Sequence, residues 1–314
     1  MVSHPRLTVL GSLNMDISVT VPRLPAPGAT VLGGAASFAP GGKGANQAVA
    51  AARLGASVAM AGCVGNDDFG RALRAALAGE GIGADSVRTV PGVPTGIAMI
   101  TVDEAGENMI TVAPGANREA GPAEIAAIAA VAGDALVISA EVPVAAIGAA
   151  LTAGSYRLRV LNLAPAPPEA ADIVAAGVDW LVVNESEATA VLGRPVTGAG
   201  GGPGLAAAAA DLARAGARNA VVTAGSAGAA YCGSAGEHFV PGFLVHPVDS
   251  VGAGDTFVGA LAVALAAGVP PRDAVVAAAA AGAAAATRPG TQPGMPRPAD
   301  VLALTGHRWP GTTG

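Results

Sequence analysis

The chain has 314 residues, of which 52% are hydrophobic and only 13% are charged, so a large apolar core is easily filled. Its net charge of −6 comes without a basic cluster, which argues against nucleic acid as a main partner, because a phosphate backbone needs a positively charged surface. The apolar tracts fall short of the ~18–20 residues that a membrane span needs, and the N-terminus lacks a signal-peptide pattern, so we expect a cytoplasmic protein that does not enter membranes.

Short Val/Ile/Leu runs alternate with Ala-rich stretches along the chain, which predicts strands and helices in turn. The expected strands are Leu7–Leu10, Val58–Gly62, Leu136–Ser139, Arg159–Asn162, Trp180–Val183 and Ala220–Thr223. The expected helices are Ala45–Leu54, Gly70–Leu77, Pro122–Val131, Glu185–Leu192, Leu205–Arg214, Thr256–Ala267 and Arg272–Ala286. This alternation predicts an α/β fold with a mostly parallel sheet covered on both faces. Ligands of such sheets bind beyond the carboxyl ends of the strands, where we expect the chemistry.

Two segments interrupt this alternation, Asp16–Ala36 and Gly96–Thr111. Both alternate apolar with polar residues, and the second runs GIAMITV, a DEAGE turn and NMITV, which predicts a hairpin. Either a small β lid over an active site or an ordinary edge hairpin accounts for this pattern. The Gly-rich tract Gly193–Gly204 is expected to be a mobile surface loop without an assigned function.

The segment Gly11-Ser-Leu-Asn-Met-Asp16 ends the first strand and places Asn14 and Asp16 on one side of an extended chain. A carboxylate beside an amide suits a polyol, whose hydroxyls both donate and accept hydrogen bonds, although a capped turn has the same pattern. Next, Gly41-Gly-Lys-Gly-Ala-Asn46 precedes a helix but is no Walker loop, because Gly44 stands where Ser or Thr should follow Lys43. It is either a flexible helix entry or a backbone cradle for a polar ligand.

Asn184 and Glu187 follow the strand Trp180–Val183 and stand three residues apart. They could hold a hydrated Mg²⁺ or phosphate oxygens, since Mg²⁺ usually keeps several waters and few protein ligands. The same spacing describes a capping box, so the pattern alone does not separate the two. Further on, Thr223-Ala-Gly-Ser-Ala-Gly228 is a turn after a strand that could admit a nucleotide.

The strongest local pattern is Asp249-Ser-Val-Gly-Ala-Gly-Asp-Thr-Phe257. The small residues Gly252, Ala253 and Gly254 let the backbone approach a ligand, and the helix that follows leaves free N–H groups at its positive end. Together they predict an anion hole for a transferring phosphoryl group. Asp255 could then accept a proton from an attacking hydroxyl, although a plain Asp N-cap is also common. We therefore expect a phosphoryl-transfer enzyme with Asp255 as its base.

Taken together, these segments resemble the ribokinase family of carbohydrate kinases from about Leu7 to Pro298. The matching motifs are GSLNMD (11–16), PGGKGANQAVAAARLG (40–55), AGENMITVAPGAN (105–117), LNLAPAP (161–167), NESEA (184–188), TAGSAG (223–228), DSVGAGDTF (249–257) and TRPGTQPGMP (287–296). The resemblance implies a three-layer α/β sandwich with a mostly parallel central sheet and a small β-sheet lid. The core would comprise 1–12, 37–95 and 112–314, and the lid 13–36 and 96–111.

The resemblance further implies ATP-dependent phosphorylation of D-ribose at its 5-hydroxyl, with Asp255 as the base and Gly252, Ala253 and Gly254 as the anion hole. The implied sugar ligands are Asn14, Asp16, Gly42, Lys43, Asn46, Glu141 and Asp255. The implied ligands of ATP and its Mg²⁺ are Asn184, Glu187, Thr223, Gly225, Ser226, Gly228 and Gly254. An activating monovalent cation, usually K⁺, would sit at Asp249, Val251, Ala285, Arg288, Gly290 and Gly294, mostly on main-chain carbonyls. Family members also form homodimers through the lid.

The sequence departs from the family pattern at Gly294, where close relatives often carry Ser, and at Ala279, where a relative can place a histidine beside the adenine. Sibling kinases act on nucleosides, deoxyribose or fructose phosphates. Phe38 is the obvious aromatic clamp near the lid, and Arg23 is the lone basic residue in Asp16–Ala36, so a small neutral sugar is favoured. A non-catalytic sugar-binding protein on this fold would lack Asp255 or its Gly-Ala-Gly turn, and both are present.

Overall fold

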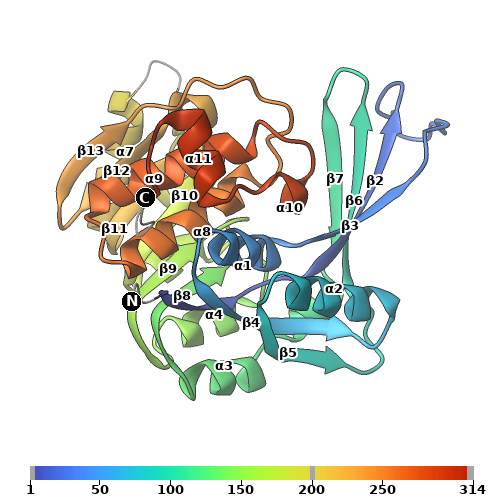
Figure 1. The fold of residues 1–314 in the computed structure, drawn as a ribbon, viewed down its shortest axis with the longest axis horizontal. Helices are drawn as coiled ribbons and strands as arrows, with labels where there is room; N and C mark the ends of the chain where they lie inside the picture. Colours follow the sequence, from blue (N-terminus) through green and yellow to red (C-terminus); the bar gives the residue numbers. More distant parts are fainter. Residues whose placement is uncertain (1–3, 199–201, 310–314) are drawn as a thin grey trace.

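The computed structural model describes residues 4–198 and 202–309. Its main element is a nine-stranded sheet in the order β13-β12-β11-β10-β9-β8-β1-β4-β5 (Figure 1). The parallel strands are β1 (Arg6–Leu10), β4 (Ser57–Gly65), β5 (Gly83–Val90), β8 (Ala132–Ser139), β9 (Ser155–Asn162), β10 (Val178–Asn184) and β11 (Ala217–Thr223). The antiparallel strands β12 (Ala229–Gly233) and β13 (Gly236–Val240) complete one edge. All six strands expected from the sequence lie in this sheet, which confirms the mostly parallel α/β fold.

Helices cover both faces of the sheet, and each face has its own apolar cluster. One face carries α1 (Lys43–Arg53), α2 (Asp68–Gly79), α8 (Ala253–Ala266), α9 (Pro271–Ala285), α10 (Thr291–Gly294) and α11 (Pro298–Thr305). The other carries α3 (Pro122–Ala129), α4 (Val144–Ala150), α5 (Ala170–Ala175), α6 (Glu185–Leu192) and α7 (Gly202–Ala215). Nearly every residue of α8 is buried, because its Ala-rich surface packs closely against the sheet and α9.

The ends of the expected helices differ from those in the structure by a few residues. The largest shift that matters for function is at α8, which begins at Ala253 rather than at the expected Thr256. α7 begins at Gly202, so the last part of the Gly-rich tract is helical rather than loop, while 199–201 lie outside the described residues. Glycine is a poor helix former, and that is why the pattern predicted a loop there.

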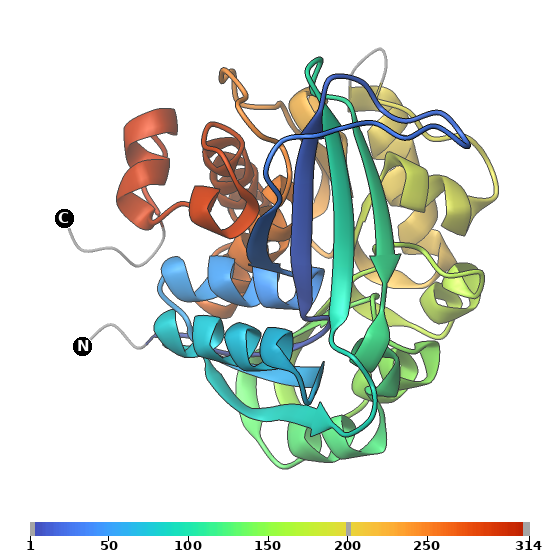
Figure 2. The ribbon, with the colours of Figure 1, turned by 90° about the vertical axis from the view of Figure 1, so that its right-hand side faces the viewer.

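A second, four-stranded sheet with the order β3-β2-β6-β7 stands beside the core (Figures 1 and 2). Its strands are β2 (Asn14–Val21), β3 (Ser37–Gly41), β6 (Gly96–Asp103) and β7 (Asn108–Ala113). β6 and β7 form the expected hairpin, whose turn is closed by the Asp103 carboxylate accepting from the Ala105 and Glu107 N–H groups. The small sheet is larger than the expected lid of 13–36 and 96–111. It also includes β3, which pairs with β2 although the expected core begins again at residue 37.

Within the two described ranges, no helix combines the length and the apolar character that crossing a membrane requires.

Candidate active site

The carboxyl ends of the central strands and the first turns of α1 and α8 surround a polar cavity of about 120 Å³. The residues that line it are Lys43, Asn162, Ala164, Val182, Val183, Asn184, Glu187, Thr223, Gly252, Gly254, Asp255 and Val258. Seven of these twelve were expected site residues, although they come from segments as far apart as Lys43 and Asp255. The parallel sheet explains the convergence, since its strands end along one edge and deliver their loops to the same place.

Asp255 occupies the first turn of α8 and is 7% exposed. The helix is capped by Gly252, whose φ of 81° suits glycine, so Asp255 lies inside the helix and is not its N-cap. Its Oδ2 accepts a hydrogen bond from Asn46 Nδ2 at 2.9 Å, and its Oδ1 accepts one from Gln47 Nε2 at 3.1 Å. The carboxylate is therefore held by side chains of α1 and does not cap its own helix.

Asn14 and Asp16 lie at the start of β2 and are not among the residues that line this cavity. The strand period places both on the same face of the small sheet. Asn14 is 3% exposed, and its Oδ1 accepts a hydrogen bond from Asn117 Nδ2 at 2.7 Å. Asn117 also pairs with both main-chain polar groups of Leu13. A side chain at Gly96 would lie 2.2 Å from Asn14 Oδ1, so glycine is required there for the amide to fit. These contacts fix the direction of the Asn14 amide.

The site carries several carboxylates around one ammonium group. Burial raises the pKa of Asp16 to about 7, and the charges of Glu141 and Asp255 add to the rise while Lys43 opposes it. The same negative charges, Asp255 above all, raise the pKa of Lys43 against the effect of burial. Glu141 is held by Ser12 Oγ and by the Lys43 N–H group. Such an arrangement provides donors and acceptors for a polyol together with groups that can take up a proton.

On the opposite side of the cavity, Asn184 and Glu187 do form a capping box. Asn184 Oδ1 accepts from the Glu187 N–H group at 2.9 Å, and Glu187 Oε2 accepts from the Asn184 N–H group at 2.8 Å. Burial raises the pKa of Glu187, and Lys43 opposes that rise. Because both residues also line the cavity, the capping and ligand-binding interpretations are compatible.

The expected nucleotide turn follows β11. Thr223 lines the cavity, whereas Gly225 and Ser226 form a short 3-10 turn that leads away from it. Gly228 closes the turn with a φ of 107°, and a side chain there would lie 2.1 Å from the Val240 carbonyl oxygen. The turn expected at 223–228 is therefore present, and its shape depends on glycine at position 228.

The expected cation positions gather between the loop that precedes α8 and the loop around α10. The Asp249 carboxylate joins them, because its Oδ1 accepts from the Val251 N–H group and its Oδ2 from the Gly290 N–H group, both at 2.9 Å. A Cβ at Gly294 would lie 3.3 Å from the Ala285 carbonyl oxygen. It would lie 3.2 Å from that of Arg288, whose side chain is paired with Asp300 instead. Among the described residues, no cluster of three or more His, Cys, Asp or Glu suited to a metal was found.

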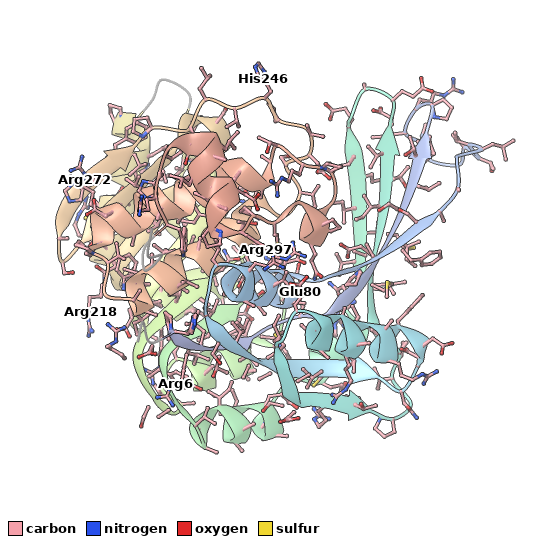
Figure 3. The ribbon with its side chains drawn as sticks, in the orientation of Figure 1. Arg6, Glu80, Arg218, His246, Arg272 and Arg297 are labelled. Atoms are coloured by element: carbon pink, nitrogen blue, oxygen red, sulfur yellow. The ribbon has the colours of Figure 1, made fainter. Side chains whose placement is uncertain are left out.

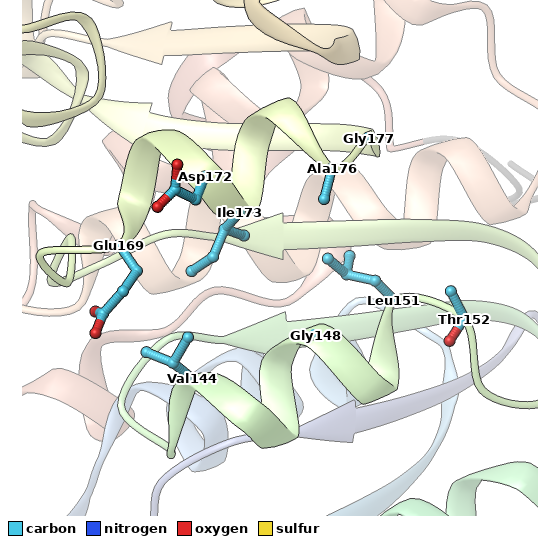
Figure 4. A pocket seen from close by; sticks show the side chains of 9 residues that line it. All are labelled: Val144, Gly148, Leu151, Thr152, Glu169, Asp172, Ile173, Ala176 and Gly177. Atoms are coloured by element: carbon cyan, nitrogen blue, oxygen red, sulfur yellow. The ribbon is translucent and has the colours of Figure 1, made fainter.

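A larger hollow of about 400 Å³ lies elsewhere, between α4 and α5 (Figure 4). Val144 and Leu151 face Ile173 across it, with Glu169 and Asp172 at the start of α5. It contains none of the expected site residues, seven of which line the smaller polar cavity instead.

A family model described as pfkB family carbohydrate kinase matches residues 4–298. The chain belongs to this family. The ribokinase of Schizosaccharomyces pombe is 37% identical over 310 residues, covering 94% of this chain and 96% of that protein. The ribokinase of Bacillus subtilis is 37% identical over 304 residues, covering 95% and 98%.

Solved structures of the family share the fold. The ribokinase of Arabidopsis thaliana, solved with ribose and ATP, superposes with a TM-score of 0.81 at 30% identity, covering 96% of this chain and 99% of that one. Phosphofructokinase-2 of Escherichia coli, solved in complex with potassium, has a TM-score of 0.78 at 27% identity and covers 96% and 98%. The expected family membership and fold are confirmed by these matches.

Four buried amides around the site were not singled out from the sequence. They are Gln47, Asn117, Asn162 and Gln292. All four stand in motifs that carry the family resemblance, which could have drawn attention to them. Their contacts could not be predicted in this way, since Asn162 and Gln292 reach α1 from 115 and 246 residues away in the chain.

Proposed function

We propose that this carbohydrate kinase transfers the γ-phosphoryl group of ATP to the 5-hydroxyl of D-ribose, giving ribose 5-phosphate and ADP. The observation that carries the proposal is the position of Asp255. Its carboxylate is buried in the first turn of α8, and its charge raises the pKa of both Asp16 and Lys43. The ribokinases that match the whole chain support ribose as the sugar.

In the proposed reaction, Asp255 accepts the proton of the sugar hydroxyl as the oxygen forms its bond to the γ-phosphorus. The bond between that phosphorus and the β,γ-bridging oxygen breaks, and ADP leaves. The N–H groups of Gly252, Ala253 and Gly254 at the start of α8 would receive the transferring group. Little covalent chemistry is required of the protein, so positioning and charge stabilisation dominate.

The sugar would be held by Asn14 and Asp16 from the small sheet and by Lys43 and Glu141 from the core. The main chain of Gly42 and the side chain of Asn46 would complete this set. The small sheet would then act as a lid that closes over the sugar, because water in the site would compete as the phosphoryl acceptor.

Oxygen donors beside the cavity fit the Mg²⁺ that accompanies ATP. Asn184 and Glu187 would hold it, and both line the cavity, where loss of solvent around the Glu187 carboxylate raises its pKa. When bound, Mg²⁺ would neutralise charge on the phosphates. Thr223, Gly225, Ser226 and Gly228 would form the wall of the nucleotide site.

The loop that precedes α8 and the segment from the end of α9 to α10 fit a monovalent cation such as K⁺. Gly294 leaves free the space toward the Ala285 and Arg288 carbonyl oxygens that a side chain would fill. Asp249 ties this group to Val251 and Gly290. When bound, the cation would offset the partial negative charge of these oxygens and stabilise the turn that begins α8. We therefore propose that K⁺ activates the enzyme.

We also propose a homodimer formed through the lid, in a protein of the cytoplasm. Apolar side chains lie exposed on the small sheet, among them Phe38 at 60%, Met99 at 47% and Met109 at 49%. Figure 2 shows the outer face of this sheet, whose upper part the described helices leave uncovered. A face of this kind suits association with a second copy.

A coupled assay of ADP release over ribose, deoxyribose, fructose and adenosine tests the substrate. With ATP and Mg²⁺ present, we expect ribose to give the highest kcat/KM and K⁺ to raise kcat above the value in a choline salt. A higher kcat/KM for adenosine or deoxyribose would assign the enzyme to a sibling activity. Absence of turnover with all four acceptors would favour a non-catalytic sugar-binding protein.

A further inference from the structure

The carboxylate of Asp255 is clamped by the amides of two consecutive residues of α1, Asn46 and Gln47. Two consecutive helical side chains reach one carboxylate because α1 and α8 cross closely. Gly259, one turn after Asp255, makes this possible, since a Cβ there would lie 2.7 Å from the Gln47 carbonyl oxygen. Each clamping amide is itself oriented by another amide, so a separate chain of hydrogen bonds serves each carboxylate oxygen.

The first chain runs through Gln47 and Asn162. Asn162 Nδ2 donates to the Val182 carbonyl oxygen at 3.2 Å, which leaves its Oδ1 to accept from Gln47 Nε2 at 2.9 Å. The same Gln47 nitrogen donates to Asp255 Oδ1, so both of its hydrogens are used. Gln47 Oε1 is buried and has no hydrogen-bond partner among the described residues. An unpaired buried acceptor is unfavourable. The orientation of Gln47 that leaves Oε1 unpaired is the one that directs its NH₂ group to Asp255.

The second chain runs through Asn46 and Gln292. Gln292 Nε2 donates to Asn46 Oδ1 at 3.1 Å, and Asn46 Nδ2 donates to Asp255 Oδ2. Arg53 fixes the main chain at Gln292, because its guanidinium donates to the carbonyl oxygens of Gln292 and Met295. Arg53 is in turn paired with Glu80 at 2.6 Å, and Glu80 is labelled beside α1 in Figure 3.

We propose that Gln47 and Gln292 are positioning residues for the proposed base. An amide that turned over would present its oxygen to the carboxylate, and the partial negative charge of that oxygen would repel the Asp255 carboxylate from its position beside the sugar hydroxyl. Gln292 prevents this turn at Asn46, and Asn162 prevents it at Gln47. The proposal rests on the proposed function, because it assigns the clamp to the same carboxylate.

Gln→Met substitutions test the two chains, since methionine fills nearly the same space without a donor. For Gln47→Met, we expect kcat with D-ribose to fall about ten- to hundredfold, as one hydrogen bond to a charged group is lost. The KM for ribose should stay within about twofold, because Gln47 hydrogen-bonds Asp255 and Asn162 but none of the other proposed sugar ligands. The melting temperature should fall only slightly, since removal of the unpaired Oε1 offsets part of the cost of leaving Asn162 Oδ1 and Asp255 Oδ1 without this donor.

For Gln292→Met, we expect kcat to fall and the KM for ribose to rise together, because Asn46 is both a clamp for Asp255 and a proposed sugar ligand. Asn162→Ala should lower kcat in the wild-type background and lower it no further in Gln47→Met. Additive losses in that double variant would overturn the chain through Gln47.

Asn219→Ala is the matched control. Asn219 is a buried amide at 4% exposure whose Oδ1 accepts from Tyr231 and whose Nδ2 donates to the Asp179 carbonyl oxygen, away from the site. We expect it to lower the melting temperature and leave kcat unchanged. If Gln47→Met behaves in that way, Gln47 has a structural role only and the proposal is wrong. If the wild-type protein does not phosphorylate ribose, the proposed function itself fails, and this result is separate.

Discussion

At the scale of single residues, the proposed chemistry depends on Asp255. Asp255→Asn keeps the size of the side chain but removes its ability to take a proton, so we expect kcat to fall by about two to four orders of magnitude. Ribose binding, measured by calorimetry, should change little, because Asn14, Asp16 and Lys43 remain. Near-normal turnover by this variant would show that another group is the base.

Asp16 should make sugar binding depend on pH. Burial and the neighbouring Glu141 and Asp255 raise its pKa from 3.8 to about 7, with Lys43 opposing the rise. Below that pH the carboxyl is protonated in the free enzyme, and it then offers a poorer acceptor to sugar hydroxyls. We expect ribose affinity to weaken as pH falls through about 7, with protons released on binding.

The sign of the effect on stability is opposite to that of a salt-bridged carboxylate. A raised pKa means that the folded free protein binds the Asp16 proton more tightly than the unfolded chain does, so stability falls as pH rises from about 4 to about 7.

The release of protons on ribose binding is measured by calorimetry in two buffers of different ionisation enthalpy. Asp16→Asn should bind ribose weakly with no such pH dependence, and an unchanged pH dependence in that variant would assign the proton to another group.

Sequence patterns singled out residues that line the cavity more readily than the residues that hold those side chains in place. Asp255 and Lys43 stand beside glycines at helix starts, where a physical reason for a polar side chain is visible in the sequence. Asn162 and Gln292 lie in apolar or loop surroundings, and their partners are 115 and 246 residues away in the chain. No local pattern carries such a pairing, so only the fold brings it out.

At the scale of elements, the site depends on how closely α1 and α8 approach each other. Gly259→Ala would place a Cβ 2.7 Å from the Gln47 carbonyl oxygen and 2.9 Å from Ala50 Cβ, so the helices must separate. We expect a loss of about 1–3 kcal/mol in the free energy of unfolding, together with a lower kcat as the clamp on Asp255 loosens. Denaturant titration and steady-state kinetics measure the two effects.

Gly148→Ala is the control for that prediction. Gly148 also lies within a helix, α4, but a Cβ there meets nothing within 4 Å among the described residues. Alanine should therefore stabilise the protein by about 0.5–1 kcal/mol through its better helix propensity. Equal effects of the two substitutions would mean that the crossing of α1 and α8 is not tight.

Two of the strands that the sequence analysis did not predict, β3 and β5, lie at sheet edges. β5 is an edge strand with few buried residues, so the apolar run that marks the central strands is missing there. β3 contains Pro40 in the sequence SFAPG and lies at the edge of the small sheet, where proline is tolerated. The formation of such strands depends more on the strands that they pair with than on the pattern of their own residues.

At the scale of the whole molecule, the lid joins the proposed sugar site to an exposed surface. In the register of the small sheet, Asp16 pairs with Ala98 and Ala98 with Val112, so these three side chains share the face of the sheet that bears the proposed sugar ligands. Met99 pairs with Ile17 and Ile17 with Phe38, which places Met99 on the outer face. The order of strands that creates this division was not contained in the local patterns, since β2 pairs with β6 some 80 residues later.

If the outer face of the lid is the dimer interface, charge placed there should separate the subunits. Met99 and Met109 are 47% and 49% exposed, and we expect the double variant Met99→Lys, Met109→Lys to sediment as a monomer where the wild type sediments as a dimer. Leu304→Lys is the control, because Leu304 is similarly exposed at 43% but lies on α11, away from the lid.

The monomeric variant should also bind ribose less well. Asn14 and Asp16 belong to the same sheet as Met99, so a partner that holds the outer face also restrains the strand that presents the sugar ligands. Releasing that restraint raises the entropy lost when the lid closes, and we expect a higher KM for ribose with kcat largely retained. Steady-state kinetics at protein concentrations checked by sedimentation measure this. A monomer with an unchanged KM would show that the lid closes independently of its partner, and a variant that stays dimeric would place the interface elsewhere.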